Sequence, residues 1–170
     1  MKKNKNGISL ITLCITVVVL AIIAGVTINV ATDLIDYAKL ENLKTDLLLI
    51  QIKCKTKAEQ ANFKNDDNVL IGTSLKNINI NAQEYIQVKY LLDNNIINSQ
   101  NITTHKIYLI NQDNLNALVL DQIKLENKEF YIVEYGENYE AEEVYYTSGF
   151  KYKGVTYYKM SEIKNIMINE

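Results

Sequence analysis

The chain has 170 residues and a formal net charge of −2, and its 18 basic residues are all lysines. So small a charge gives no positive field to attract nucleic acid, and arginine, the best bidentate partner of phosphate, is absent. Cys14 and Cys54 would lie too far apart on one helix to form a bridge, so no disulfide framework is indicated, although an intermolecular bridge through Cys54 stays open. The length suits one small domain behind a helical N-terminal segment.

The N-terminal stretch joins a short basic head to a long apolar run. Lys2, Lys3 and Lys5 form the head, and no charged residue follows until Asp33. This charge-free run of about 25 residues exceeds the ~20 that a helix needs to cross the hydrocarbon of a bilayer. We therefore predict a transmembrane helix over residues 8–32 in contact with membrane lipid. The lysines should stay in the cytoplasm and the rest of the chain should lie outside.

Three interpretations of this stretch compete. It is a plain signal anchor, a cleaved secretory signal, or a precursor segment that is cut near its start. The second fits poorly, because the apolar run is longer than the ~7–15 residues of a secretory signal. The third rests on Gly7, which stands between the basic head and the apolar run. A cut after Gly7 would remove the head alone and leave Ile8 as the first residue of a hydrophobic helix.

The residues of this pattern are Lys2, Lys3, Lys5, Gly7 and Ile8-Ser9-Leu10-Ile11-Thr12-Leu13, with the apolar helix after them. The pattern covers about the first fifth of the chain and resembles the start of the type IV pilin and type II secretion pseudopilin superfamily. In that family a prepilin peptidase cuts after the glycine and methylates the new amino terminus. The resemblance implies a leader at residues 1–7, cleavage between Gly7 and Ile8, and N-methylation of Ile8.

Two positions depart from the family pattern. Thr12 stands where the family usually has a glutamate, the fifth residue of the mature chain, which pairs with the amino terminus of a neighbouring subunit. Threonine cannot form that ion pair, and some minor pseudopilins and many clostridial pilin-like proteins also lack the glutamate. Family members often have a proline near the position of Asn29, whereas this chain contains no proline at all.

Residues 33–63 are predicted to continue the helix as an amphipathic stalk. They contain neither proline nor glycine, and apolar residues recur at steps of three and four. The stripe comprises Leu40, Leu43, Leu47, Ile50, Cys54, Ala58 and Ala61, and we expect Leu48 and Ile52 to widen it. The stripe should pack on the chain's own C-terminal domain, although a coiled coil stays open. The pilin resemblance implies the same layout.

Residues 64–170 are predicted to form an extracytoplasmic α+β domain. A helix is expected from Gln83 to about Asn94, with one apolar face formed by Tyr85, Ile86, Lys89, Tyr90 and Leu92. Residues 98–104 should be a polar loop, and Asn111 should cap a short helix through Leu115 and Leu118. Strands are expected at residues 106–110, 123–125, 129–135, 143–147, 150–152 and 155–158, with a brief extended piece at 78–81 and a closing helical turn at 160–164. The fold class is α+β, with a long N-terminal helix packed on a small antiparallel sheet.

Residues with catalytic or metal-binding chemistry are few. His105 is the sole histidine and is expected at the surface of a loop. Asp66 and Asp67 could join a calcium site, but their spacing matches no calcium loop, so a solvated turn is the simpler interpretation. No zinc-binding helix motif, phosphate-binding glycine loop or serine elbow occurs. We therefore expect no enzymatic activity, no metal and no cofactor.

The C-terminal strands are rich in tyrosine. Rings over a sheet can stack bases or bind sugars, but alternate core positions of a sheet explain the same pattern. The acidic turn from Glu137 to Glu143 would repel a phosphate backbone, so nucleic acid is not expected as a partner. The residues concerned are Tyr131, Tyr135, Tyr145, Tyr146, Tyr152, Tyr157 and Tyr158.

The sequence thus predicts a pilin-like structural subunit. A prepilin peptidase would process its single-pass membrane precursor, and the assembly machinery would build it with other subunits into a type IV pilus or pseudopilus. Thr12 favours a minor subunit. After assembly the protein would lie at the cell surface or in a filament. The alternative is a single-span membrane-anchored surface protein whose outer domain binds a ligand or partner.

Overall fold

The structure is a computed structural model that describes residues 10–136 and 138–166, and the side chains of 13–22, 34–136 and 138–166. The chain divides into two compact units, Met1–Lys39 and Leu40–Glu170. Helix α1 begins at Leu10 and ends at Lys64, as the lack of proline allows. Among the described residues, no helix has the length and apolarity needed to cross a membrane. The predicted span 8–32 falls largely outside the described side chains and stays a prediction.

The second unit is built on the apolar stripe of α1. The seven predicted positions, from Leu40 to Ala61, are all buried. Leu48 and Ile52, in contrast, are 42% and 51% exposed, so the prediction that they widen the stripe is wrong. At about 100° of rotation per residue, both side chains leave the face that Leu47 and Ile50 occupy.

The helix packs on a five-stranded antiparallel sheet. Its strands are β1 (Thr73–Ser74), β2 (Lys106–Ile110), β3 (Tyr131–Tyr135), β4 (Ala141–Tyr152) and β5 (Val155–Lys159). They neighbour one another in chain order, so the predicted antiparallel sheet is a meander. Lys153 and Gly154 join β4 to β5 with φ angles of 47° and 84°, the left-handed conformation that a two-residue hairpin turn requires.

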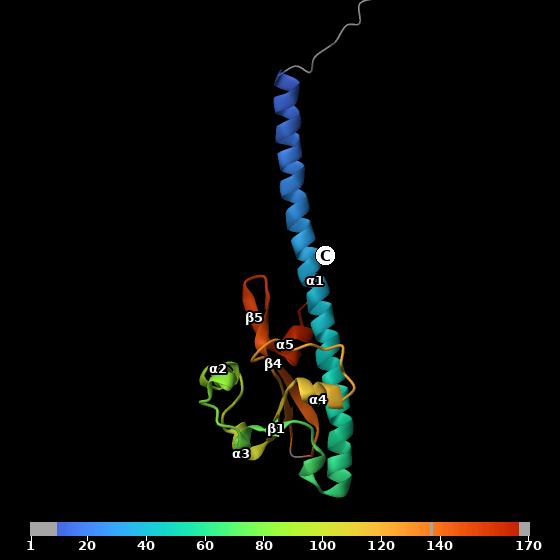
Figure 1. Cartoon of the computed structure of the whole chain (residues 1–170), viewed down its shortest axis with the longest axis vertical. Coiled ribbons are helices and arrows are strands. Elements are labelled where there is room, and N and C mark those ends of the chain that lie inside the picture. Colours follow the sequence, from blue (N-terminus) through green and yellow to red (C-terminus); the bar gives the residue numbers. More distant parts are fainter. Residues whose placement is uncertain (1–9, 137, 167–170) are drawn as a thin grey trace, which may run out of the picture. The chain divides into compact units, whose positions relative to one another are not determined.

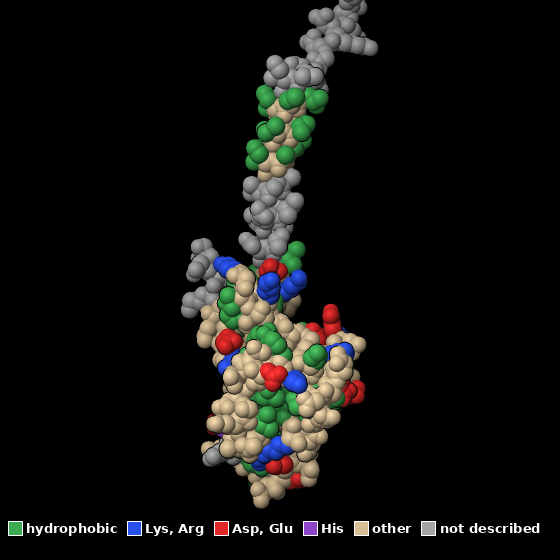
Figure 2. All heavy atoms as spheres, turned by 90° about the vertical axis from the view of Figure 1, so that its left-hand side faces the viewer, with side chains coloured by type: hydrophobic (Ala, Val, Ile, Leu, Met, Phe, Trp, Pro, Cys, Tyr) green, Lys and Arg blue, Asp and Glu red, His purple; other side chains and the backbone are tan. Residues whose placement is uncertain are grey.

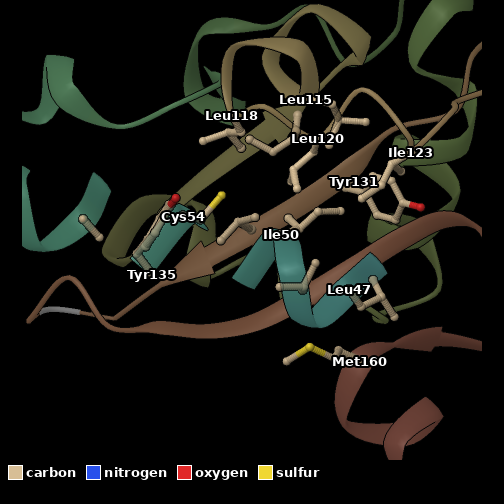
Figure 3. Packing of buried hydrophobic residues seen from close by; sticks show 14 of the residues in the cluster. Leu47, Ile50, Cys54, Leu115, Leu118, Leu120, Ile123, Tyr131, Tyr135 and Met160 are labelled. Carbon is tan, nitrogen blue, oxygen red and sulfur yellow. The ribbon is translucent and has the colours of Figure 1, made fainter. Parts of the chain in front are cut away.

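The central strand β3 is buried along its whole length. Tyr131, Val133 and Tyr135 enter the core that α1 covers, whereas Ile132 enters a second core on the opposite face. This division follows from the alternation of side chains along a strand. Figure 3 shows Leu47 and Ile50 of α1 in the first core, among side chains from the sheet and from residues 115–123.

Short helices complete the two layers around the sheet (Figure 1). The first core also receives side chains from α4 (Gln112–Ala117), from the segment after it and from α5 (Met160–Lys164). Asn111 caps α4, as predicted, and forms a capping box with Asn114. On the other face lie α2 (Ile86–Asp93), which follows a 3₁₀ turn at Gln83–Tyr85, and α3 (Asn101–Thr104). Two further 3₁₀ turns, Asp67–Val69 and Leu75–Asn77, flank β1.

The predicted apolar face of α2 is right for Tyr85 and Leu92, which pack against the second core, but wrong for Ile86 and Tyr90. The helix buries Val88 and Leu91, while Ile86 and Tyr90 are 51% and 49% exposed. The aliphatic side chains of Val88 and Leu91 pack into the second core with Ile132, whereas Tyr90 can keep its hydroxyl group in water. The opposite face of α2, which carries Ile86 and Tyr90, is therefore open to solvent.

Three further segments differ from prediction. Residues 123–125 form no strand, because the side-chain amide of Gln112 binds the Ile123 carbonyl and the Leu125 amide in place of a neighbouring strand. Residues 78–81 form no strand either, and the expected loop at 98–104 contains α3. The two strands expected at 143–147 and 150–152 are one strand, β4, with a shift of register in its pairing to β5.

The neighbours Leu47 and Leu48 give a matched test of the helix–sheet contact. A fragment starting at Asp33 should fold as one unit, because the second unit contains its own core. In this fragment Leu47→Ala should lower the free energy of unfolding by ~2–5 kcal/mol, since it opens a cavity at a fully buried position. Leu48→Ala should change it by less than ~0.5 kcal/mol. Urea denaturation measures both, and equal midpoints would mean that Leu47 does not contact the sheet in solution.

Candidate functional site

The side chains of the residues that the family resemblance singles out are outside the described ones. Gly7 and Ile8 lie outside the described residues. Thr12 belongs to helix α1, but its side chain is outside the described ones. The candidate site lies instead in the second unit.

A pocket opens where α2 faces β4 and β5, on the side of the sheet opposite α1. Its volume is about 290 Å³. Figure 2, which is viewed from the α2 side, shows apolar side chains on this face interrupted by polar atoms. The residues that line the pocket are Ile86, Gln87, Tyr90, Thr147, Ser148 and Tyr158.

A β-bulge in β4 supplies the polar side of this pocket. The register with β5 shifts between Tyr145 and Phe150, and Gly149 inside this interval has a φ of 70°. A Cβ at Gly149 would come within 2.6 Å of side-chain carbons of Thr156 and Tyr158, so both the angle and the space require glycine here. A bulge bends the strand and redirects the side chains around it.

Hydrogen bonds fix the two bulge hydroxyl groups. Thr147 Oγ1 accepts from the Phe130 amide at 2.9 Å and lies 3.0 Å from Gln87 Oε1. Ser148 Oγ lies 3.1 Å from the same Gln87 oxygen, but only 2.6 Å from a carboxylate oxygen of Glu129. A hydroxyl group has one hydrogen, and the shorter, charge-assisted bond to Glu129 takes it.

Gln87 therefore keeps hydrogen-bonding capacity for a ligand. The Thr147 hydrogen can go to Gln87 Oε1 or to the Phe130 carbonyl, both at 3.0 Å, and the Ser148 hydrogen goes to Glu129. The side-chain NH₂ group of Gln87 has no hydrogen-bond partner among the described residues. The polar side of the pocket thus offers both donors and acceptors.

Glu129 adds negative charge behind the bulge. Its carboxylate accepts from the hydroxyl groups of Ser148 at 2.6 Å and Tyr146 at 3.0 Å, and from the amide of Glu126 at 2.9 Å. Burial and this carboxylate raise the pKa of Tyr146 to about 12, so its phenol stays protonated and can donate. These bonds hold Glu129 in place, and its charge makes the site unfavourable for anions.

Tyrosine rings form the apolar side. The ring centroids of Tyr90 and Tyr158 lie 6.0 Å apart with an interplanar angle of 43°. Burial and the neighbouring Tyr90 raise the pKa of Tyr158, so the Tyr158 ring is a neutral phenol at physiological pH. Ile86 completes this wall. Tyr158, one of the tyrosines expected on the sheet, lies half-buried on β5.

A second polar cluster surrounds the buried carboxylate of Glu134. It receives hydrogen bonds from Asn101 Nδ2 at 2.5 Å, the Tyr145 hydroxyl at 2.6 Å and His105 Nδ1 at 2.8 Å. His105 is thus half-buried, and the prediction of a surface histidine is wrong, because α3 carries it onto β3. Burial alone would raise the pKa of Glu134, but the three hydrogen bonds together hold it below its usual range.

The acidic loop after α1 is also tied to the domain. Asp67 lies 2.6 Å from Lys106 Nζ and accepts a hydrogen bond of 2.5 Å from the Tyr139 hydroxyl. The hydrogen bonds from Lys106 and Tyr139 lower the pKa of Asp67. Asp66 accepts from the amide of Asn68 and caps the 3₁₀ turn. Both carboxylates therefore have partners inside the chain, which favours the structural interpretation of this loop over a calcium site.

Comparisons with protein-family models, curated proteins and solved structures gave no match to this chain. The sequence did not single out Gln87, Thr147 or Ser148. One signal was present, since Gly149 interrupts a β-rich segment, and a glycine inside a strand often marks a bulge.

Glu134 gives the domain a dependence on pH. Its folded-state pKa is lowered, so its ionised form stabilises the fold above the unfolded pKa of about 4.3. This contribution is lost as the pH falls through the folded pKa. At pH 7, Glu134→Gln should cost about 1.5–3 kcal/mol in free energy of unfolding, and the difference from wild type should shrink below about pH 4.

Denaturant unfolding of the Asp33 fragment between pH 3 and 7 measures this effect. The exposed Glu140 supplies the control, because Glu140→Gln removes the same charge outside the cluster. A constant gap between wild type and Glu134→Gln across this range would contradict the assignment of the effect to the Glu134 charge.

Proposed function

We propose that this protein is a pilin-like structural subunit. A prepilin peptidase cuts its membrane-anchored precursor between Gly7 and Ile8 and methylates Ile8. The helix over residues 8–32 leaves the lipid and packs on other subunits of a type IV pilus or pseudopilus with the help of the assembly machinery. The position of Gly7 carries the proposal, since the glycine separates a lysine head from a charge-free run.

The architecture of the second unit supports this proposal. It is α+β, with the outer half of a long helix packed through one stripe on a small antiparallel sheet. The pilin resemblance implies that layout. The stripe is buried in the core of its own domain, so it is not available to another subunit. The N-terminal part of the helix is then the part that contacts other subunits.

The first unit offers apolar surface for such contacts. The large apolar side chains between Leu13 and Ile22 are 46–64% exposed. Lipid tails are as apolar as leucine, so transfer from the bilayer into a filament gains little from the hydrophobic effect. The gain must come from close packing between helices, and the identity of residues at the interface therefore matters.

Thr12 favours a minor subunit. A carboxylate buried in an apolar filament core costs several kcal/mol in desolvation and needs a well-placed partner. Thr12 carries no such cost, but it cannot pair with a neighbour's amino terminus. A homopolymer would therefore lack a polar contact that fixes its register, whereas a site supported by other subunits does not need one.

Processing is the direct test. Protein from the native cell should begin at Ile8 and carry an N-methyl group, as intact-mass and N-terminal analysis would show. Gly7→Ala should slow the cut markedly, because the peptidase is proposed to act after this glycine. Retention of Lys2 to Gly7 in the wild type would favour the alternative, a surface protein that stays anchored.

Filament formation tests the role of Thr12. With the assembly machinery but without other subunits, the wild type should form few filaments, visible by electron microscopy. Thr12→Glu should increase their number, because the carboxylate can pair with a neighbouring amino terminus. Thr12→Gln is the matched control of the same size and should not. Abundant wild-type homopolymers would show that the carboxylate is dispensable.

A further inference from the structure

We propose that the pocket between α2, β4 and β5 binds the ring of a neutral sugar, one pyranose unit of a larger glycan. This function goes beyond assembly, since it belongs to the second unit alone. It holds whether residues 8–32 pack in a filament or simply anchor the chain.

The size of the pocket sets the first limit. Ligand pockets commonly enclose ~300–1,000 Å³, and this one, at about 290 Å³, lies at the lower end. Such a volume accommodates one six-membered ring with its substituents. A longer ligand would have to continue outside the pocket.

The walls set the second limit, because apolar and polar groups occupy opposite sides. A pyranose has one face rich in C–H groups and a rim of hydroxyl groups. The C–H face suits the rings of Tyr90 and Tyr158, which lie side by side at a tilt and are not buried in the core. The hydroxyl rim suits Gln87 and Ser148, which offer an NH₂ donor and an oxygen acceptor.

Charge decides against the nearest alternatives. The Glu129 carboxylate behind Ser148 disfavours phosphates, carboxylates and therefore nucleotides. A quaternary ammonium ion binds best to a cage of aromatic faces, and this pocket has two rings and a polar side that such an ion could not use. A neutral polyhydroxyl ring can contact both the tyrosine rings and the polar groups of the pocket.

The pocket is also preorganised. Gly149 and the bulge fix the direction of Thr147 and Ser148, and Glu129 holds the Ser148 hydrogen. Ser148 thus presents a fixed acceptor rather than a rotating hydroxyl group. Such fixed groups lower the entropy lost on binding.

Saturation-transfer NMR on the full-length chain tests the proposal. The detergent should have a polyoxyethylene head group, because a maltoside or glucoside would compete for the site. Glucose, galactose, mannose and N-acetylglucosamine serve as probes, with tetramethylammonium and benzoate beside them. At least one sugar should receive saturation at its ring C–H protons, and its Kd should rise about tenfold in Tyr90→Ala and in Gln87→Ala.

Two control variants separate binding from folding. Tyr90→Phe keeps the ring and should keep binding. Tyr37→Ala removes a tyrosine that is 42% exposed, close to the 49% of Tyr90, but does not line the pocket. It should bind as the wild type does, and thermal unfolding followed by circular dichroism should show that all variants fold.

The proposal is overturned if none of the four sugars receives saturation, or if Tyr90→Ala binds as tightly as wild type. Saturation of tetramethylammonium or benzoate in place of the sugars would overturn it as well. None of these results bears on cleavage after Gly7, so failure here and failure of the pilin-like function are distinguishable.

Discussion

The burial of one helical stripe against one face of a sheet is the contact on which the second unit depends. The stripe changes in size along its length, from leucine and isoleucine at Leu40 to Ile50 to alanine at Ala58 and Ala61, and all its members are buried. Leucine and isoleucine fill the core beside side chains of α4, α5 and the sheet, and the alanines need less space. Figure 3 shows Cys54 with its sulfur beside the hydroxyl group of Tyr135. Burial raises the pKa of this thiol to about 11, so Cys54 serves the core as a neutral, apolar group.

The same packing makes β3 a strand with two buried faces, and a polar residue on it must find its partners inside the protein. Glu134 is such a residue, and it is satisfied by donors from α3, from the residue after α3 and from β4. Removing one of these donors should destabilise the fold, because the buried charge would then lack a hydrogen bond that offsets its desolvation. The cluster therefore links α3 to the sheet and fixes the second layer. We regard it as structural for this reason.

The edge of the sheet has more freedom than its centre. β5 pairs with β4 alone, and the pairing between these two strands shifts its register around Gly149. This shift directs Thr147 and Ser148 toward α2, whose apolar residues already occupy the second core and leave Tyr90 outside. The pocket and the α1 stripe thus lie on opposite faces of the sheet. Ligand binding at one face would leave the helix contact at the other undisturbed, so the two proposed functions draw on separate residues.

The sequence by itself determined the parts of the protein that depend on local periodicity. The stripe of α1, the strands at 106–110 and 155–158 and the capped helix after Asn111 follow from spacing and from short-range hydrogen bonds. It also carries the pattern around Gly7, which the described residues do not include. The tertiary structure decided which of two possible faces became buried, because that choice depends on partners distant in the chain. The tertiary structure exposes Leu48, Ile52 and Tyr90 and places His105 beside Glu134. It also places Gln87 next to Ser148, 61 positions away in the sequence, where both line the pocket.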